Sequence, residues 1–121
     1  MPIKKILVVD DSPTERQFML EALSKLGYQV VLAESGEEGV AKARAEQPEL
    51  VLMDVVMPGS NGFQATRQIA RDNATKHIPV IICTTKSQET DRIWGMRQGA
   101  RDYIVKPVDL NELATKIAAL G

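Results

Sequence analysis

Three aspartates in this sequence follow directly on short apolar runs. Asp10 and Asp11 come after the run ILVV at 6–9, and Asp54 comes after the run LVLM at 50–53. If the two runs are buried strands of one sheet, their ends deliver three acids to the same edge. Carboxylates held that close repel one another, so the cluster is stable only if a cation lies among them or a proton is shared. The search for a functional site therefore starts at these three acids.

Short apolar runs alternate with amphipathic stretches along the chain. We expect strands at 5–9, 28–33, 50–53, 80–83 and 102–105, each followed by a helix. Helix starts are indicated by four capping residues, each with Glu or Gln three positions later: Ser12, Ser35, Asn61 and Asp109. Two helices carry apolar stripes that we expect to face the core: Met19, Leu23 and Leu26 on the first, and Leu110, Leu113, Ile117 and Leu120 on the last.

Strict alternation of strand and helix predicts an α/β fold with a five-stranded parallel sheet and helices on both faces. The run at 28–33 is less uniformly apolar than strands one, three and four, so we expect the second strand at an edge of the sheet. The expected strand order is 2-1-3-4-5, which is that of a flavodoxin-like doubly wound sheet. Ligands of such sheets bind beyond the carboxyl ends of the strands, where the winding reverses, here between strands one and three. We expect residues 1–121 to form one domain.

Further polar residues follow the other central strands. Thr84 stands at the end of the fourth strand and Lys106 at the end of the fifth. Clustered carboxylates suit Mg²⁺, which takes one or two of them and recruits a phosphate oxygen. Lysine supplies a phosphate-binding charge and threonine a donor. The chemistry indicated is phosphoryl transfer to a carboxylate, and Asp54 is our choice of nucleophile because it is the single acid on the central strand, whereas Asp10 and Asp11 suit the metal and its waters.

Composition excludes several classes of protein. The net charge of −1, the pI near 5.8 and the scattered 15 basic residues give no attraction to nucleic acid. The apolar run at the start breaks at Asp10, too soon for a signal peptide or a membrane span, so we expect a cytoplasmic protein without membrane insertion. The one cysteine, Cys83, reads as a buried apolar residue, and His77 as a surface loop residue.

Four segments resemble the receiver domains of bacterial two-component response regulators: VVDDS at 8–12, LMDVVMPGSNG at 52–62, CTT at 83–85 and GARDYIVKP at 99–107. The resemblance spans essentially the whole chain. It implies that Asp54 accepts a phosphoryl group, that Asp11, Asp54 and the backbone carbonyl of Val56 ligate Mg²⁺, and that Asp10 helps through water. A receiver is a phosphorylatable signalling domain that catalyses only its own phosphorylation and dephosphorylation.

The same resemblance implies that Thr84 and Lys106 contact the phosphoryl oxygens. Thr84 and Tyr103 would form a switch pair, in which the hydroxyl moves toward the phosphoryl group and the ring enters the vacated space. The peptide bond before Pro107 matches a position that is typically cis in this family. Val56 and Lys86 would flank the route of the hydrolytic water, and a branched Val56 predicts a long-lived phosphorylated form.

Within the family the chain is similar to single-domain, chemotaxis-type regulators. The segments GFQATRQ at 62–68 and TTKSQETDRIWGMRQGARDY at 84–103 look most like the twitching-motility branch that controls type IV pili. This implies a histidine kinase of the chemotaxis type as phosphodonor. It also implies a downstream protein target at the face made by the fourth helix, the fifth strand and the fifth helix, including Arg92, Arg97, Arg101 and Tyr103.

Two rival functions share parts of this pattern. A Mg²⁺-dependent phosphohydrolase with an aspartyl nucleophile would place two acids as Asp-x-Asp on one strand and carry a cap segment, whereas Asp10 and Asp11 are adjacent and no cap segment is present. A nucleotide or flavin carrier needs a glycine- or hydroxyl-rich first loop, whereas Asp10 to Pro13 present two anions and lack one N–H. Trp94 is left open between core packing and an exposed partner surface.

Overall fold

The computed structural model describes residues 3–120, without the side chain of Ser60. Five parallel strands form one sheet in the order β2-β1-β3-β6-β7. Their bounds are β1 Lys5–Val9, β2 Gln29–Ala33, β3 Leu50–Met53, β6 Val80–Thr84 and β7 Asp102–Val105. Because β6 and β7 are the fourth and fifth strands of the expected set, the predicted order is confirmed. Strand two begins one residue later than expected and strand four ends one residue later.

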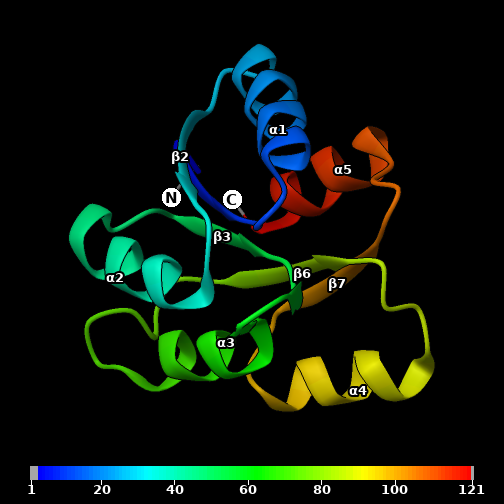
Figure 1. The fold of residues 1–121 in the computed structure, drawn as a ribbon. Coiled ribbons are helices and arrows are strands. Elements are labelled where there is room, and N and C mark those ends of the chain that lie inside the picture. The colour runs from blue at the N-terminus through cyan, green and yellow to red at the C-terminus, as the bar shows by residue number, and fades with distance from the viewer. Residues whose placement is uncertain (1–2, 121) are drawn as a thin grey trace.

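Helices cover both faces of the sheet. They are α1 Pro13–Lys25, α2 Gly36–Glu46, α3 Gly62–Arg71, α4 Glu89–Arg97 and α5 Leu110–Leu120. Figure 1 shows α1 and α5 on one face and α2, α3 and α4 on the other. None of these helices is long and apolar enough to cross a membrane.

The four predicted helix caps are confirmed. The side chains of Ser12, Ser35 and Asn61 each accept a hydrogen bond from the backbone N–H three residues later, at 3.1–3.2 Å. The Asp109 side chain accepts from the backbone N–H groups of Asn111 and Glu112, at 2.9 and 3.2 Å. These bonds satisfy donors that a helix start leaves without partners, which is why the local pattern located the helices.

The core follows the twofold period of the strands. Leu7 and Met53 point to the face of α2 and α3, whereas Ile6 and Leu52 point to the face of α1 and α5. Alternate residues of β1 and β3 therefore fill two separate apolar layers, and both strands are buried on both sides. Burial on both sides fixes the positions of β1 and β3, and so of the residues that follow their carboxyl ends.

Two residues of the predicted core stripes lie at the surface. Leu26 is 52% exposed because α1 ends at Lys25 and the chain turns away through Gly27, whose φ is +94°. Leu110, the first residue of α5, is 40% exposed. With Phe18 they line a groove of about 360 Å³ between α1 and α5. The expectation that Leu26 and Leu110 face the core was wrong, whereas Met19, Leu23, Leu113 and Ile117 are buried as predicted.

A short hairpin that the sequence analysis did not predict follows β3. Strands β4 (Val56–Met57) and β5 (Ser60–Asn61) pair antiparallel around Pro58 and Gly59. The chain then returns so closely that a Cβ on Gly62 would collide with the backbone carbonyl of Asp54 and lie 2.7 Å from Val55 Cα. Only glycine fits at position 62, and the hairpin is thereby packed against the segment that carries Asp54.

Candidate functional site

The three aspartates meet at the carboxyl edge of the sheet. The backbone N–H of Asp10 donates to Ala33 on β2, and that of Asp54 donates to Val9 on β1, both at 3.0 Å, so the pairing of the strands fixes both residues. One carboxylate oxygen from each of Asp10, Asp11 and Asp54 lies within 4.8 Å of the other two. Asp10 and Asp54 are buried and Asp11 is exposed. The predicted convergence of the acids is therefore present.

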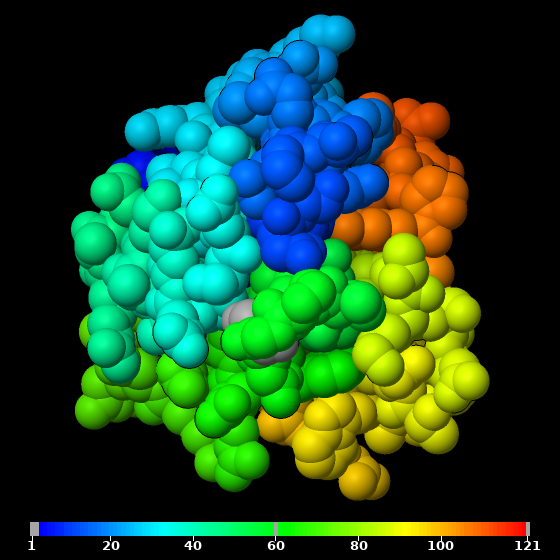
Figure 2. Space-filling view, in the orientation of Figure 1, coloured from blue at the N-terminus to red at the C-terminus, as the bar shows by residue number. Residues whose placement is uncertain are grey.

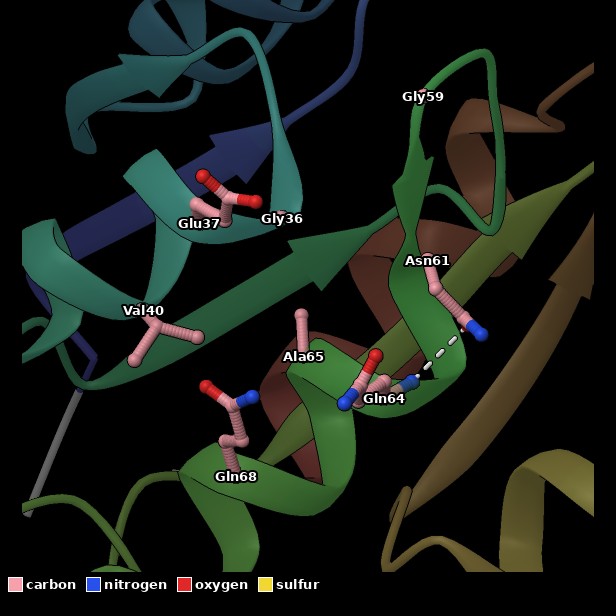
Figure 3. A pocket seen from close by; sticks show the side chains of 8 residues that line it. All are labelled: Gly36, Glu37, Val40, Gly59, Asn61, Gln64, Ala65 and Gln68. Carbon is pink, nitrogen blue, oxygen red and sulfur yellow. Dashed lines mark hydrogen bonds between the residues drawn. The ribbon is translucent and has the colours of Figure 1, made fainter.

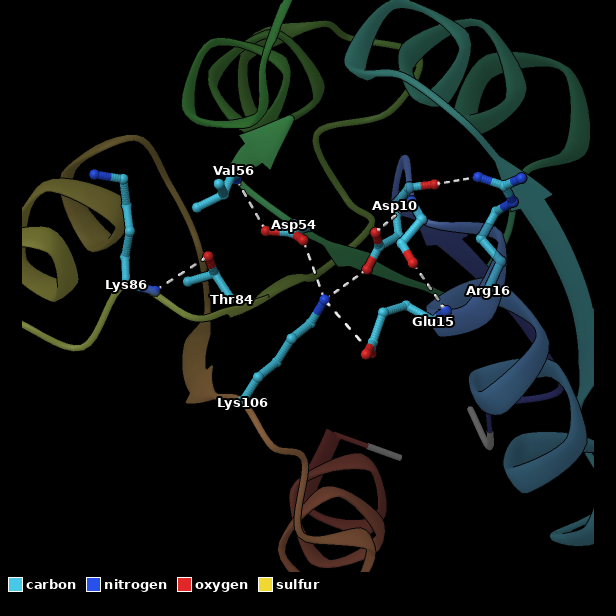
Figure 4. A network of polar contacts seen from close by, with 9 residues as sticks. Asp10, Glu15, Arg16, Asp54, Val56, Thr84, Lys86 and Lys106 are labelled. Carbon is cyan, nitrogen blue, oxygen red and sulfur yellow. Dashed lines mark hydrogen bonds and ion pairs between the residues drawn. The ribbon is translucent and has the colours of Figure 1, made fainter. Parts of the chain in front are cut away.

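Lys106 lies among these acids. Its Nζ is 2.6 Å from Asp10 Oδ2 and 3.1 Å from Asp54 Oδ2 (Figure 4). Its backbone N–H donates to the carbonyl of Thr84 at 2.8 Å, which fixes the end of β7 beside β6. The peptide bond between Lys106 and Pro107 is cis, as the family resemblance implies. Of the two ways to stabilise the cluster, a cation or a shared proton, the chain itself supplies a cation.

Burial and ion pairing act on these groups in opposite directions. Burial by itself lowers the pKa of Lys106, but the hydrogen bond to Asp10 and the charges of Asp54 and Asp10 outweigh it, so the pKa lies above its ordinary value. Burial raises the pKa of Asp10, and the hydrogen bonds from Lys106 and from the Ser12 N–H reduce that rise without cancelling it. Lys106 is therefore a stable cation, while the negative charge of Asp10 is held at a cost.

Asp54 is bonded through both carboxylate oxygens. Oδ1 accepts from the backbone N–H of Val56 at 2.9 Å, and Oδ2 faces Lys106. Val56 itself is 44% exposed. On the face seen in Figure 2, the start of α1 lies beside the segment that carries the β4–β5 hairpin, which in turn lies beside the loop after β6. Asp54 is therefore buried, and the exposed side chain of Val56 lies beside it.

The donor set of the acid cluster suits a hard divalent cation. Its ligand atoms are carboxylate oxygens, and one of the three acids is exposed, which leaves room for metal-bound water. Mg²⁺ prefers such a set of one or two carboxylates with several waters. The residues present therefore fit the ion that the sequence analysis expected.

Thr84 and Tyr103 both contact the loop that follows β6. Thr84 is fully buried, and its Oγ1 accepts from the backbone N–H of Lys86 at 3.4 Å. The Tyr103 hydroxyl donates to the carbonyl of Lys86 at 2.8 Å, and its ring is 6% exposed against Val55, Ile82 and Ala100. Burial, followed by the charges of Asp91 and Asp54, raises the Tyr103 pKa to about 12. The predicted pair is thus linked through one residue, Lys86.

Two charged residues at the site were not singled out from the sequence. Arg16 donates to the backbone carbonyl of Asp10 at 2.8 Å and pairs with Glu34 at 3.1 Å. Glu15 lies 3.6 Å from Lys106 Nζ. The sequence marks Glu15 only as the third residue after a helix cap, and its contact with a residue 91 positions later has no local signal.

The remaining sequence predictions concern residues away from the acids. Cys83 is buried, and burial raises the pKa of its thiol to about 12. His77 is exposed, as expected. Trp94 is 49% exposed, with Ile93 at 45% and Met96 at 39%. Trp94 therefore lies at the surface and is not part of the core.

A separate hollow of about 520 Å³ lies between α2 and α3 (Figure 3). Glu37, Asn61, Gln64 and Gln68 supply its polar lining. The Asn61 side chain there accepts from the Gln64 N–H and so serves the start of α3. The three clustered aspartates do not line this hollow, so it is separate from the candidate functional site.

Comparisons with known proteins agree with this geometry. A family model described as the response regulator receiver domain matches residues 6–118. The protein PilH of Pseudomonas aeruginosa is 60% identical over 116 residues, which are 96% of each chain. The chain also matches longer transcriptional regulators, of which it spans about half the length.

Solved structures give the same result. The chemotaxis protein CheY4 of Vibrio cholerae superposes with a TM-score of 0.91 at 29% identity, over 98% of this chain and 99% of that one. The receiver domain of the sensor histidine kinase PA1611 from Pseudomonas aeruginosa, solved with a magnesium ion coordinated in its active-site cleft, gives 0.89 at 30% identity, over 97% and 96%. The chain therefore belongs to the response regulator receiver domains, which take phosphoryl groups from histidine kinases in two-component signalling.

Proposed function

We propose that Asp54 is the residue that accepts the phosphoryl group. The observation that carries this proposal is the contact of Asp54 with Lys106, an ammonium brought from another strand to within 3.1 Å of Oδ2. Phosphoryl transfer needs little beyond positioning and neutralisation of charge on the equatorial oxygens. Asp54 is positioned by its backbone bond to β1 and by the Val56 N–H, and the cation is already in place.

The proposed cofactor is Mg²⁺, held by Asp11, Asp54 and the backbone carbonyl of Val56, with Asp10 acting through water. When bound, the ion neutralises charge on the acids and on the phosphoryl oxygens. The proximity of the three carboxylates supports this assignment. Asp10 is also paired with Lys106, so the same residue would orient both the metal-bound water and the ammonium.

Lys106 and Thr84 are the proposed contacts of the transferred group. Lys106 remains protonated because its pKa lies above the ordinary value, so it offers a permanent positive charge to the phosphoryl oxygens. Thr84 would donate its hydroxyl proton after leaving its present bond with the Lys86 N–H. That bond is long, at 3.4 Å, and exchanging it for a charge-assisted bond is favourable.

The proposed switch couples Thr84 to Tyr103 through the loop of Lys86. Tyr103 binds the carbonyl of Lys86 and Thr84 binds its N–H, so a movement of the threonine would change the contacts of the segment that anchors the ring. Phosphorylation would then change the populations of two packings of this loop and ring. The ring is already buried in this structure, so the inward packing would be the one that phosphorylation favours.

The proposed target surface comprises α4, β7 and α5. Ile93, Trp94 and Met96 on α4 and Val105 on β7 are exposed apolar side chains, and Arg92, Arg97 and Arg101 are exposed nearby in the sequence. An exposed indole with apolar neighbours and arginines is typical of a binding surface. Tyr103 lies on β7, so the proposed switch acts within the surface that a downstream protein would contact.

The phosphodonor would be a histidine kinase of the chemotaxis type, and the output would be control of twitching motility. Similarity to PilH and to CheY4 supports both assignments. We propose further that residues 1–121 act as one receiver domain in the cytoplasm, where ATP-dependent kinases work, and that the chain catalyses only its own phosphorylation and dephosphorylation.

Incubation with acetyl phosphate tests the proposal. With Mg²⁺ the wild-type chain should gain one phosphoryl group in the intact mass, and a chelator should prevent the gain. Asp54→Asn should gain none, because an amide does not attack phosphorus. Labelling of Asp54→Asn at the wild-type rate would place the acceptor elsewhere. Repeated turnover of simple phosphate esters would instead favour the phosphohydrolase.

A further inference from the structure

Lys106 has a third carboxylate neighbour, which is more exposed to solvent than the other two. Glu15 Oε2 lies 3.6 Å from Lys106 Nζ (Figure 4). The side chain of Glu15 is 40% exposed, whereas those of Asp10 and Asp54 are 6% and 8% exposed. Glu15 is therefore the most solvent-exposed of the three carboxylates that face the ammonium.

The helix start does not explain the placement of this carboxylate. In a reciprocal capping box the Glu side chain would accept the N–H of Ser12. Here the Ser12 N–H donates to Asp10 Oδ1 at 3.0 Å instead, while the Glu15 N–H donates to Ser12 Oγ at 3.2 Å. At α2, by contrast, Glu38 Oε1 does accept a backbone N–H, from Glu34 at 2.8 Å. The Glu15 carboxylate is left to pair with Lys106.

We propose that Glu15 determines phosphodonor specificity by charge: it disfavours small, highly charged anionic donors at the site and shares Lys106 with Asp54. The inference rests on the proposed role of Asp54. In transfer from acetyl phosphate, an Asp54 carboxylate oxygen forms a bond to phosphorus, the bond from phosphorus to the bridging oxygen breaks, and acetate leaves with the electron pair. No proton or further reactant is needed. Glu15 takes no part in bond making and acts only through its charge.

The size of the effect follows from Coulomb's law. A unit charge about 6 Å from an approaching anion in water lowers the anion's local concentration about threefold for a monoanion and about tenfold for a dianion. Salt screens interactions between such exposed charges. Phosphoramidate, largely a monoanion at neutral pH, and acetyl phosphate, a dianion, are therefore matched probes of the same transfer.

The test compares initial labelling rates by intact mass, with Mg²⁺ at low ionic strength and over a range of donor concentrations. Glu15→Gln should react faster with acetyl phosphate by about tenfold and with phosphoramidate by about threefold, through a lower half-saturation concentration, and both gains should shrink at high salt. Glutamine also suits this capping position, so the variant should fold. Glu15→Asp keeps the charge and should stay near the wild-type rates.

Glu21→Gln is the control for net charge. Glu21 lies on the exposed side of α1, where it accepts from Gln17 at 2.9 Å, and its neutralisation should leave both rates unchanged. Equal acceleration of both donors, acceleration that persists at high salt, or no acceleration in Glu15→Gln would overturn the inference about Glu15 alone. Absence of labelling in the wild-type chain with either donor would overturn the proposed function, and the inference with it.

Discussion

Replacing Lys106 with methionine tests whether this lysine holds the acid cluster together. Methionine has a similar length and no charge, so the change removes the ammonium while filling the same space. Asp10 and Asp54 then lose their shared partner, at present 2.6 and 3.1 Å from Nζ. The two carboxylates remain buried.

The magnitude follows from the burial of the pair. The side chains of Lys106, Asp10 and Asp54 are 11%, 6% and 8% exposed. Removing one partner of a buried ion pair costs about 3–5 kcal/mol. Because Asp11 is exposed and gives water some access, we expect the lower end, about 3 kcal/mol, in urea denaturation at neutral pH without Mg²⁺.

The loss should depend on pH with a defined sign. The pKa of Asp10 is already raised above 3.8, so its ionisation favours the unfolded state. Removing Lys106 raises that pKa further. The stability difference between the variant and the wild type is therefore small below the wild-type folded pKa of Asp10, grows as the pH rises from there to the higher folded pKa of the variant, and is constant above it. Lowering the pH below the raised folded pKa of Asp10 in the variant should therefore restore much of the stability lost relative to the wild type.

Lys116→Met provides the matched control. Lys116 Nζ lies 2.8 Å from Asp102 Oδ2, but the side chains are 26% and 30% exposed. A pair with that access to solvent contributes at most about 1 kcal/mol. An equal loss in the two variants, or a loss in Lys106→Met that does not change with pH, would refute the reasoning.

Three further changes give separate predictions. Asp11→Asn should stabilise the metal-free protein by about 1 kcal/mol, since it relieves repulsion from Asp10 and Asp54; a lower melting temperature would show that these acids are not crowded. Val56→Asn should speed loss of the phosphoryl group measured by mass, because a polar side chain would replace the exposed apolar one beside Asp54; an unchanged decay would remove the shielding role. Gly95→Ala should move the Tyr103 ring in ¹³C-tyrosine NMR spectra, because its Cβ would lie 2.7 Å from Ile82 Cδ1 and 3.3 Å from Tyr103 Cε2. If the ring does not move, the backbone of α4 has shifted to make room for the added Cβ instead.

The sequence predicted those features that depend on local pattern or on strand ends. Apolar runs located the strands, capping residues located the helices, and the rule that ligands bind at the carboxyl ends of parallel strands brought Asp10, Asp11, Asp54 and Lys106 together. The β4–β5 hairpin was missed because strands of two residues are too short to show a period. Leu26 was misplaced because apolar spacing continues past the point where the backbone turns.

Contacts between distant residues had no such signal. Glu15 and Lys106 are far apart in the chain, and the first was read only as part of a helix start. The acceptor for the Tyr103 hydroxyl is the backbone carbonyl of Lys86, and any residue type provides a carbonyl. The close approach of Gly62 to Asp54 likewise depends on the path of the hairpin between them. These features follow from the packing of the whole fold.

Locating the phosphoryl group tests the central claim most directly. After incubation with acetyl phosphate and Mg²⁺, borohydride reduction converts an aspartyl phosphate to homoserine, and peptide mass spectrometry identifies its position. The account predicts homoserine at position 54, in amounts that depend on Mg²⁺. Homoserine at position 10 or 11 with an unmodified residue 54 would contradict it.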